Sequence, residues 1–222
     1  MTEPDVALTD FLLTAQCGVF AYSLSRQTAV RFRLKSLCVQ LFAVIGIASL
    51  IGGTVHGYFN DESTWQFQGF WRAGLVVLGA GSYFSWLIGA ELIWRGAGRK
   101  WITLFALAGL AGYSAYVLFW DQRYMFAILN YLPATVFLLF AFLLQIRRGE
   151  KRPGLFGAVS VVVTLAAAAI QQLGIAIHPT YCNHNALYHL LQAAGLVLLL
   201  IAFRWLIMRD ESTPNPKVEI GP

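Results

Sequence analysis

Apolar residues fill most of the chain in seven long runs, which are separated by short polar connections. A helix needs about 20 apolar residues to cross the hydrocarbon core of a bilayer, and each run is about that long. The sequence therefore predicts an all-α integral membrane protein, a bundle of seven transmembrane helices. The expected spans are 8–25, 36–58, 70–94, 101–120, 124–145, 155–177 and 184–207.

The connections alternate in charge. Three of them are short and basic, whereas the connections between them carry acidic residues or no basic residue. Fourteen of the 16 Lys and Arg residues thus fall on one side of the bundle, and only Arg72 and Arg123 fall on the other. Because basic loops stay in the cytoplasm, we expect the N-terminus outside and the C-terminus in the cytoplasm.

Composition agrees with this topology. Hydrophobic residues make up 58% of the chain and charged residues only 12%, against about 25% charged in a soluble domain, which excludes a soluble enzyme. The net charge of +5 is a topology signal, so no nucleic-acid partner is expected. We expect one membrane domain over 1–209 and a disordered cytoplasmic tail over 210–222, which holds three prolines and four charges. The compact loops, without glycosylation sequons, favour a bacterial plasma membrane.

Small residues and one proline stand inside the predicted helices. Glycines inside membrane helices usually allow close helix packing, which we expect at Gly52, Gly53, Gly79, Gly81, Gly109 and Gly112. Pro133 should kink the fifth helix, because it frees a backbone carbonyl one turn earlier.

Polar side chains are costly within the bilayer, and here they gather toward the predicted outer helix ends. The residues concerned are Asp10, His56, Gln171, Gln172, His178, His184 and His189. Asn185 and His189 share a helix face with Gln192, whereas His184 lies about 140° from His189 and contributes only if the first turn is loose. A compact site would combine His56, Asn185 and His189 with Asp10 or Asp61 as the carboxylate.

Other interpretations stay open for these polar residues. Histidines at helix ends also lie at low cost among headgroups and water, which is the alternative for His178 and His184. Glu91, near the cytoplasmic end of the third helix, is expected to snorkel or to pair with Arg95. A proton-carrying role in transport is the alternative for Glu91.

The seventh predicted helix opens with the sequence Asn-Ala-Leu-Tyr-His-Leu-Leu, residues 185–191. Together with seven helices and a histidine ending the second, this resembles the superfamily of alkaline ceramidases and progestin/adipoQ receptors. The resemblance implies a zinc-dependent hydrolase with His56 and His189 as metal ligands. The first histidine of the family's H-x-x-x-H pair is replaced by Asn185, and Gly52 stands where the family has a serine.

From the residues and the resemblance, the first hypothesis is a hydrolase of lipid amides or esters near the outer leaflet. Its zinc would be held by His56, His189 and His184, its catalytic carboxylate would be Asp61 or Asp10, and its substrate would contact Asn185, Tyr188 and Gln192. The alternative is a non-catalytic protein that binds a membrane lipid or a small apolar ligand, or assists a membrane complex. Haem bound between His56 and His189 is a further alternative. A transporter is not favoured, because the predicted helices carry no charged residues at the bilayer midplane.

Overall fold

The computed structural model describes residues 3–94 and 96–209, and it is all-helical over them, with seven helices. These are α1 (Pro4–Arg26), α2 (Phe32–Tyr58), α3 (Trp65–Ile93), α4 (Ala97–Phe119), α5 (Tyr124–Arg147), α6 (Lys151–Gln172) and α7 (His184–Met208). Each is long and apolar enough to cross a membrane, which confirms the expected seven helices and is compatible with a multi-pass membrane protein. The tail predicted over 210–222 lies outside the described residues.

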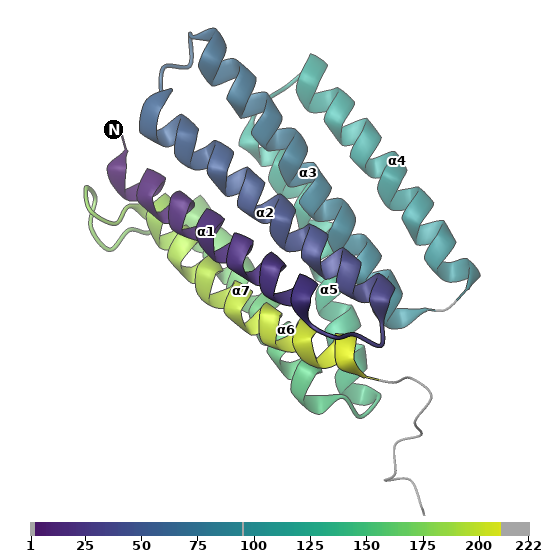
Figure 1. Ribbon diagram of the computed structural model, residues 1–222. Coiled ribbons are helices and arrows are strands. Elements are labelled where there is room, and N and C mark those ends of the chain that lie inside the picture. Colours follow the sequence, from purple (N-terminus) through teal and green to yellow (C-terminus); the bar gives the residue numbers. More distant parts are fainter. Residues whose placement is uncertain (1–2, 95, 210–222) are drawn as a thin grey trace, which may run out of the picture.

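Six of the helices close into a ring. Each helix in the order α1, α2, α3, α5, α6, α7 packs against the next, and α7 returns to α1. Helix α4 stands outside the ring, where it packs along α3 and only marginally against α5 (Figure 1). This order places α3 and α7 on opposite sides of the ring.

Two helices differ from the predicted bounds in ways that move polar residues. Helix α1 begins at Pro4, four residues early, so Asp10 lies in its second turn rather than at its start. Helix α6 ends at Gln172, five residues before the predicted end. Gly174 follows with a φ of 67°, a left-handed conformation that suits glycine and ends the helix. His178 therefore lies in the α6–α7 connection, paired through its backbone with Cys182.

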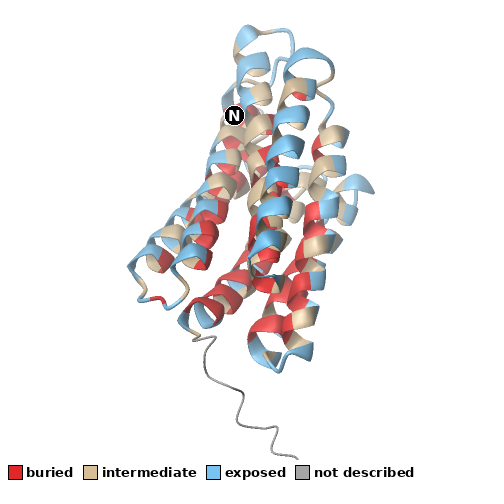
Figure 2. Ribbon diagram, turned by 90° about the vertical axis from the view of Figure 1, so that its right-hand side faces the viewer, coloured by how far each residue is buried: buried red, intermediate tan, exposed pale blue. Residues whose placement is uncertain are grey.

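The large buried side chains gather in one half of the bundle. They come from the second half of α1, the first half of α2 and the last turns of α3, α5 and α7, around Phe42, Phe142 and Phe203. This half is the predicted cytoplasmic end, and Figure 2 shows buried residues concentrated there, away from the end marked N. The predicted outer half, where α1, α3, α5 and α7 begin, is packed less densely.

Several of the glycines pack closely, as predicted. A Cβ built on Gly52 would lie 2.8 Å from Asp10 Oδ2, and one on Gly79 would lie 2.6 Å from the ring of Tyr113. The prediction is wrong for Gly109 and Gly112, which have nothing within 4 Å of an added Cβ. They lie on α4, the helix outside the ring, on a face that no described residue covers.

Glu91 anchors the predicted cytoplasmic end of α3. Its carboxylate lies 2.7 Å from Arg99 Nη1 and 3.3 Å from Arg33 Nε, and its backbone carbonyl accepts a hydrogen bond from Arg31. Arg95, the predicted partner, lies outside the described residues. Through these ion pairs Glu91 connects α3 to α4 and α2. Its side chain is only 9% exposed.

Candidate functional site

A cavity of about 430 Å³ lies inside the ring, in the predicted outer half. Six helices line it: α1, α2, α3, α5, α6 and α7. Its volume is in the range of sites for small molecules. The packed core described above closes the other half of the ring, so the cavity does not continue to the predicted cytoplasmic end among the described residues.

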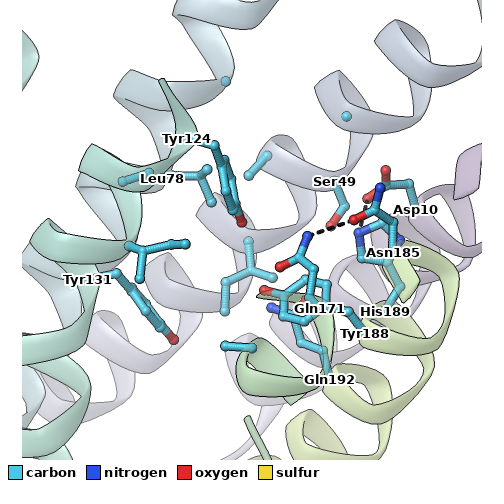
Figure 3. Close-up of a pocket in the computed structure, with 18 of the residues that line it drawn as sticks. Asp10, Ser49, Leu78, Tyr124, Tyr131, Gln171, Asn185, Tyr188, His189 and Gln192 are labelled. Atoms are coloured by element: carbon cyan, nitrogen blue, oxygen red, sulfur yellow. Dashed lines mark hydrogen bonds and ion pairs between the residues drawn. The ribbon is translucent and has the colours of Figure 1, made fainter. Parts of the chain in front are cut away.

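The cavity has one polar wall and one apolar wall. Helix α7 contributes only side chains with polar groups: His184, Asn185, Tyr188, His189 and Gln192. Helix α3, on the opposite side of the ring, contributes Phe70, Trp71, Gly74, Leu75, Val77, Leu78 and Gly81. Figure 3 shows this separation, with Leu78 on one side and Asn185 and His189 on the other. The cavity is therefore amphipathic.

An acid and an imidazole meet at the polar wall. His189 Nε2 lies 3.4 Å from Asp10 Oδ1, and the two side chains are 11% and 5% exposed. The other ring nitrogen, Nδ1, lies 3.0 Å from Thr9 Oγ1, which is also 2.9 Å from the carbonyl oxygen of Val6. When the Thr9 hydroxyl donates to that carbonyl, its oxygen accepts a hydrogen bond from Nδ1–H of His189. Nε2 of His189 and the Asp10 carboxylate then attract each other only when a proton lies between them.

Helix α2 makes room for this pair. Asp10 Oδ2 sits directly against Gly52, where any side chain would collide with the carboxylate. Ser49, Gly52 and His56 are spaced three and four residues apart, so they share one face of α2, and all three line the cavity. The glycine that departs from the family's serine thus accommodates Asp10.

The N-terminus of α1 is tied across the predicted outer end. Glu3 Oε2 lies 2.5 Å from His56 Nδ1, and the backbone amide of Glu3 donates to the carbonyl of His56. Asp5 accepts a hydrogen bond from the backbone amide of Asn183, the residue that caps α7. These bonds hold α1 to α2 and α7 at the rim of the cavity.

Asn185 is engaged by a neighbouring helix. Its side-chain oxygen accepts a hydrogen bond of 2.9 Å from Gln171 Nε2 on α6 (Figure 3). Its own backbone amide donates to the cap residue Asn183. The pair of amides therefore joins α6 to α7 at the polar wall and presents further donor and acceptor groups there.

The structure brings most of the predicted site residues together. Among the residues expected in the site, those that line the cavity are Asp10, His56, His184, Asn185, Tyr188, His189 and Gln192. His184 and His189 both line it although they lie far apart around the helix. Asp61 does not line it. The Asp61 carboxylate instead accepts hydrogen bonds from the Ser63 hydroxyl and backbone amide, which lower its pKa.

Some cavity residues escaped the sequence reasoning. Trp71 and Tyr124 are aromatic residues at helix ends, as expected of an interfacial belt, yet both line the cavity, and Trp71 Nε1 donates to the carbonyl of Gln122. Ser49 also lines the cavity, and the helical spacing that places it on the same face of α2 as Gly52 is the signal that could have found it. Thr9 does not line the cavity but contacts His189, and the sequence gives no signal for this contact because it depends on how α1 packs against α7.

A bound metal would need at least three suitable ligands close together. In residues 3–94 and 96–209, no group of three or more His, Cys, Asp or Glu side chains is placed to hold a metal ion. His56 and His189 line the same cavity, but Nδ1 of His56 contacts Glu3, and both ring nitrogens of His189 face Asp10 or Thr9. In this arrangement the side chains do not fit a zinc site. Zinc therefore stays a prediction from the resemblance.

Comparison with known proteins gives a family match. A profile of the family described as "Family of unknown function (DUF6962)" matches residues 6–207, which span all seven helices. No curated protein and no solved structure matches the chain.

Proposed function

The chain belongs to the DUF6962 family, whose description names no function, and we propose from its cavity that the protein binds a small amphipathic molecule inside the membrane. The observation that carries this proposal is the opposition of a polar α7 wall to an apolar α3 wall around about 430 Å³. A molecule with a polar head and an apolar body satisfies both walls at once. A wholly apolar molecule would leave the polar groups of α7 without partners.

The site would face the outer leaflet if the chain has the topology that its basic loops predict. The ligand would then enter from outside or from the outer leaflet, because the predicted cytoplasmic half is filled by the packed core. The compact loops support a bacterial plasma membrane as the location. No metal is required for this function.

The test compares two alanines on the same helix. Ala168 of α6 lines the cavity, whereas Ala166, two residues earlier, is exposed and outside it. Phenylalanine at 168 would fill part of the cavity, and phenylalanine at 166 would lie on the outer surface of the bundle.

The wild type and both variants are purified from membranes, and the small molecules that copurify are identified by mass spectrometry. We expect a molecule enriched with the wild type and with Ala166→Phe, and lost from Ala168→Phe. Equal content in all three proteins, or no enriched molecule in any of them, would overturn the proposal.

A hydrolase of lipid amides or esters is the second candidate. It is favoured by the buried Asp10–His189 pair, since an acid and an imidazole within reach of each other are suited to proton transfer. It also follows from the resemblance to alkaline ceramidases.

The zinc that the resemblance implies is tested by elemental analysis of the purified protein, with His56→Ala and His189→Ala as comparisons. Zinc near one per chain that is lost in both variants would favour the hydrolase and justify lipid-amide assays. Zinc that is absent from the wild type, or unchanged in both variants, would count against it.

A further inference from the structure

The charge inside the cavity is one-sided. Asp10 is the only Asp or Glu side chain among the described residues that line the cavity, and no Lys or Arg of that part of the chain lines it. The side chain within ion-pair distance of Asp10 is His189, at 3.4 Å. The Asp10 carboxylate is therefore buried without a permanently charged partner.

An ionised carboxylate in such an environment needs a counter-charge, because the bilayer interior solvates charge poorly. In the empty cavity a proton shared between Asp10 and His189 supplies it. A cationic group on a ligand can supply it instead. An anionic ligand would add a second negative charge beside Asp10, and the cavity has no Lys or Arg to balance it.

The other groups of the cavity suit a cation as well. Tyr124, Tyr131 and Tyr188 line it together with Phe70 and Trp71, and aromatic faces attract organic cations. Tyr124 and Tyr131 lie on the side of Leu78, and Tyr188 lies on the side of Asn185 and His189 (Figure 3). A ligand whose protonated amine lies at Asp10 would thus meet aromatic side chains in the same cavity.

The predicted outer end would attract cations toward the cavity. It carries Glu3, Asp5, Asp61, Glu62 and Asp121, against two basic residues, Arg72 and Arg123. Arg123 is itself paired with Asp121 at 2.6 Å. An excess of acidic groups at this end raises the local concentration of cations there.

We infer that the ligand of this cavity is an amphipathic amine, whose protonated nitrogen pairs with Asp10 and whose apolar body lies against α3. This inference rests on the proposed function and adds the charge of the ligand to it. It distinguishes the site from one for fatty acids or anionic lipid headgroups, which would require Arg or Lys at the polar wall.

Three probes of one shape and different charge test the inference: 4-phenylbutylamine, 4-phenylbutan-1-ol and 4-phenylbutanoate. Binding is measured at neutral pH by equilibrium dialysis of the radiolabelled probes against the full chain in phosphatidylcholine nanodiscs, with empty nanodiscs subtracted. The variants are Asp10→Asn, which removes the charge and keeps the shape, and Glu62→Gln. Glu62 is an exposed acid of the same end that does not line the cavity.

We expect the wild type and Glu62→Gln to bind the amine at least about tenfold more tightly than the alcohol, and the acid most weakly. In Asp10→Asn the advantage of the amine over the alcohol should vanish while the alcohol binds as before. Unchanged alcohol binding also shows that the variant is folded.

The failures are distinguishable. If the alcohol and the acid bind as tightly as the amine, or the amine keeps its advantage in Asp10→Asn, the inference is wrong and the amphipathic site stands. If none of the probes binds the wild type, the inference and the proposed function both lose their support. If Asp10→Asn loses alcohol binding as well, Asp10 holds the shape of the cavity, and its pairing with a ligand cation is rejected.

Discussion

The substitution Gly89→Ala tests how closely α3 and α5 pack. A Cβ on Gly89 would lie 2.5 Å from Phe137 Cε1 and 2.8 Å from its Cδ1, about 1 Å closer than carbon atoms pack at their optimum. The Phe137 ring cannot move aside easily, because it lies between Trp86 and Trp94, with centroid distances of 4.6 and 5.9 Å. Helix α3 or α5 must therefore shift.

Overpacking of this kind costs about 1–3 kcal/mol, and replacing glycine by alanine within a helix returns up to about 1 kcal/mol. The control is Gly109→Ala on α4, where an added Cβ meets nothing within 4 Å and only the helix-propensity gain remains. The two variants should thus differ by roughly 2 kcal/mol in stability. At about 2–4 °C per kcal/mol, this is a difference of roughly 4–8 °C in Tm.

Thermal unfolding in detergent, followed by tryptophan fluorescence, measures the difference. The double variant Gly89→Ala with Phe137→Leu should recover part of the loss, because the smaller side chain removes the collision. If Gly89→Ala melts at or above the temperature of Gly109→Ala, the close packing of α3 on α5 is refuted.

Three further outcomes follow from charges and hydrogen bonds outside the cavity and from the metal motif. Glu91→Gln should lower stability by about 1–3 kcal/mol, since it removes the acid beside Arg99, and a Tm equal to the wild type would contradict this network. Ser63→Ala should raise the pKa of Asp61, which NMR titration of its carboxyl carbon can measure. Because the pKa of Asp61 is lowered in the folded protein, the small stabilisation from Asp61 is present at neutral pH and is lost as the pH falls through that pKa. Asn185→His completes the H-x-x-x-H pair and should raise the zinc bound per chain if the resemblance to alkaline ceramidases reflects a common site, whereas unchanged zinc would count against it.

The helices were predictable because a membrane helix depends on one dominant property, a long apolar run. Their ends were less so. The predicted sixth helix ran five residues too far, since residues 173–177 are mostly apolar and the break at Gly174 depends on a backbone conformation that hydropathy does not report. The early start of α1 was hidden for the opposite reason, because Pro4 and Asp5 do not look like part of an apolar run.

The polar wall was predictable from helical spacing, and its partners were not. Asn185, His189 and Gln192 follow one face of a single helix, so their sequence numbers alone place them together. The approach of Asp10 to His189 depends on how α1 packs against α7 and on the absence of a side chain at Gly52. Contacts between distant helices of this kind leave no periodic signal in one sequence.

The two ends of the bundle show that the cavity is a feature of the sequence rather than a failure of packing. The predicted cytoplasmic end is filled by large side chains such as Phe42 and Phe203. At the predicted outer end, small residues face the cavity from four helices: Ala48, Gly52, Gly74, Gly81, Ala127 and Ala168. In a membrane, helices associate through close packing, and atoms that line a space lose dispersion contacts, so keeping it open lowers stability. A chain selected only for stability would fill this space with residues as large as those at the other end, which argues that the space serves a ligand.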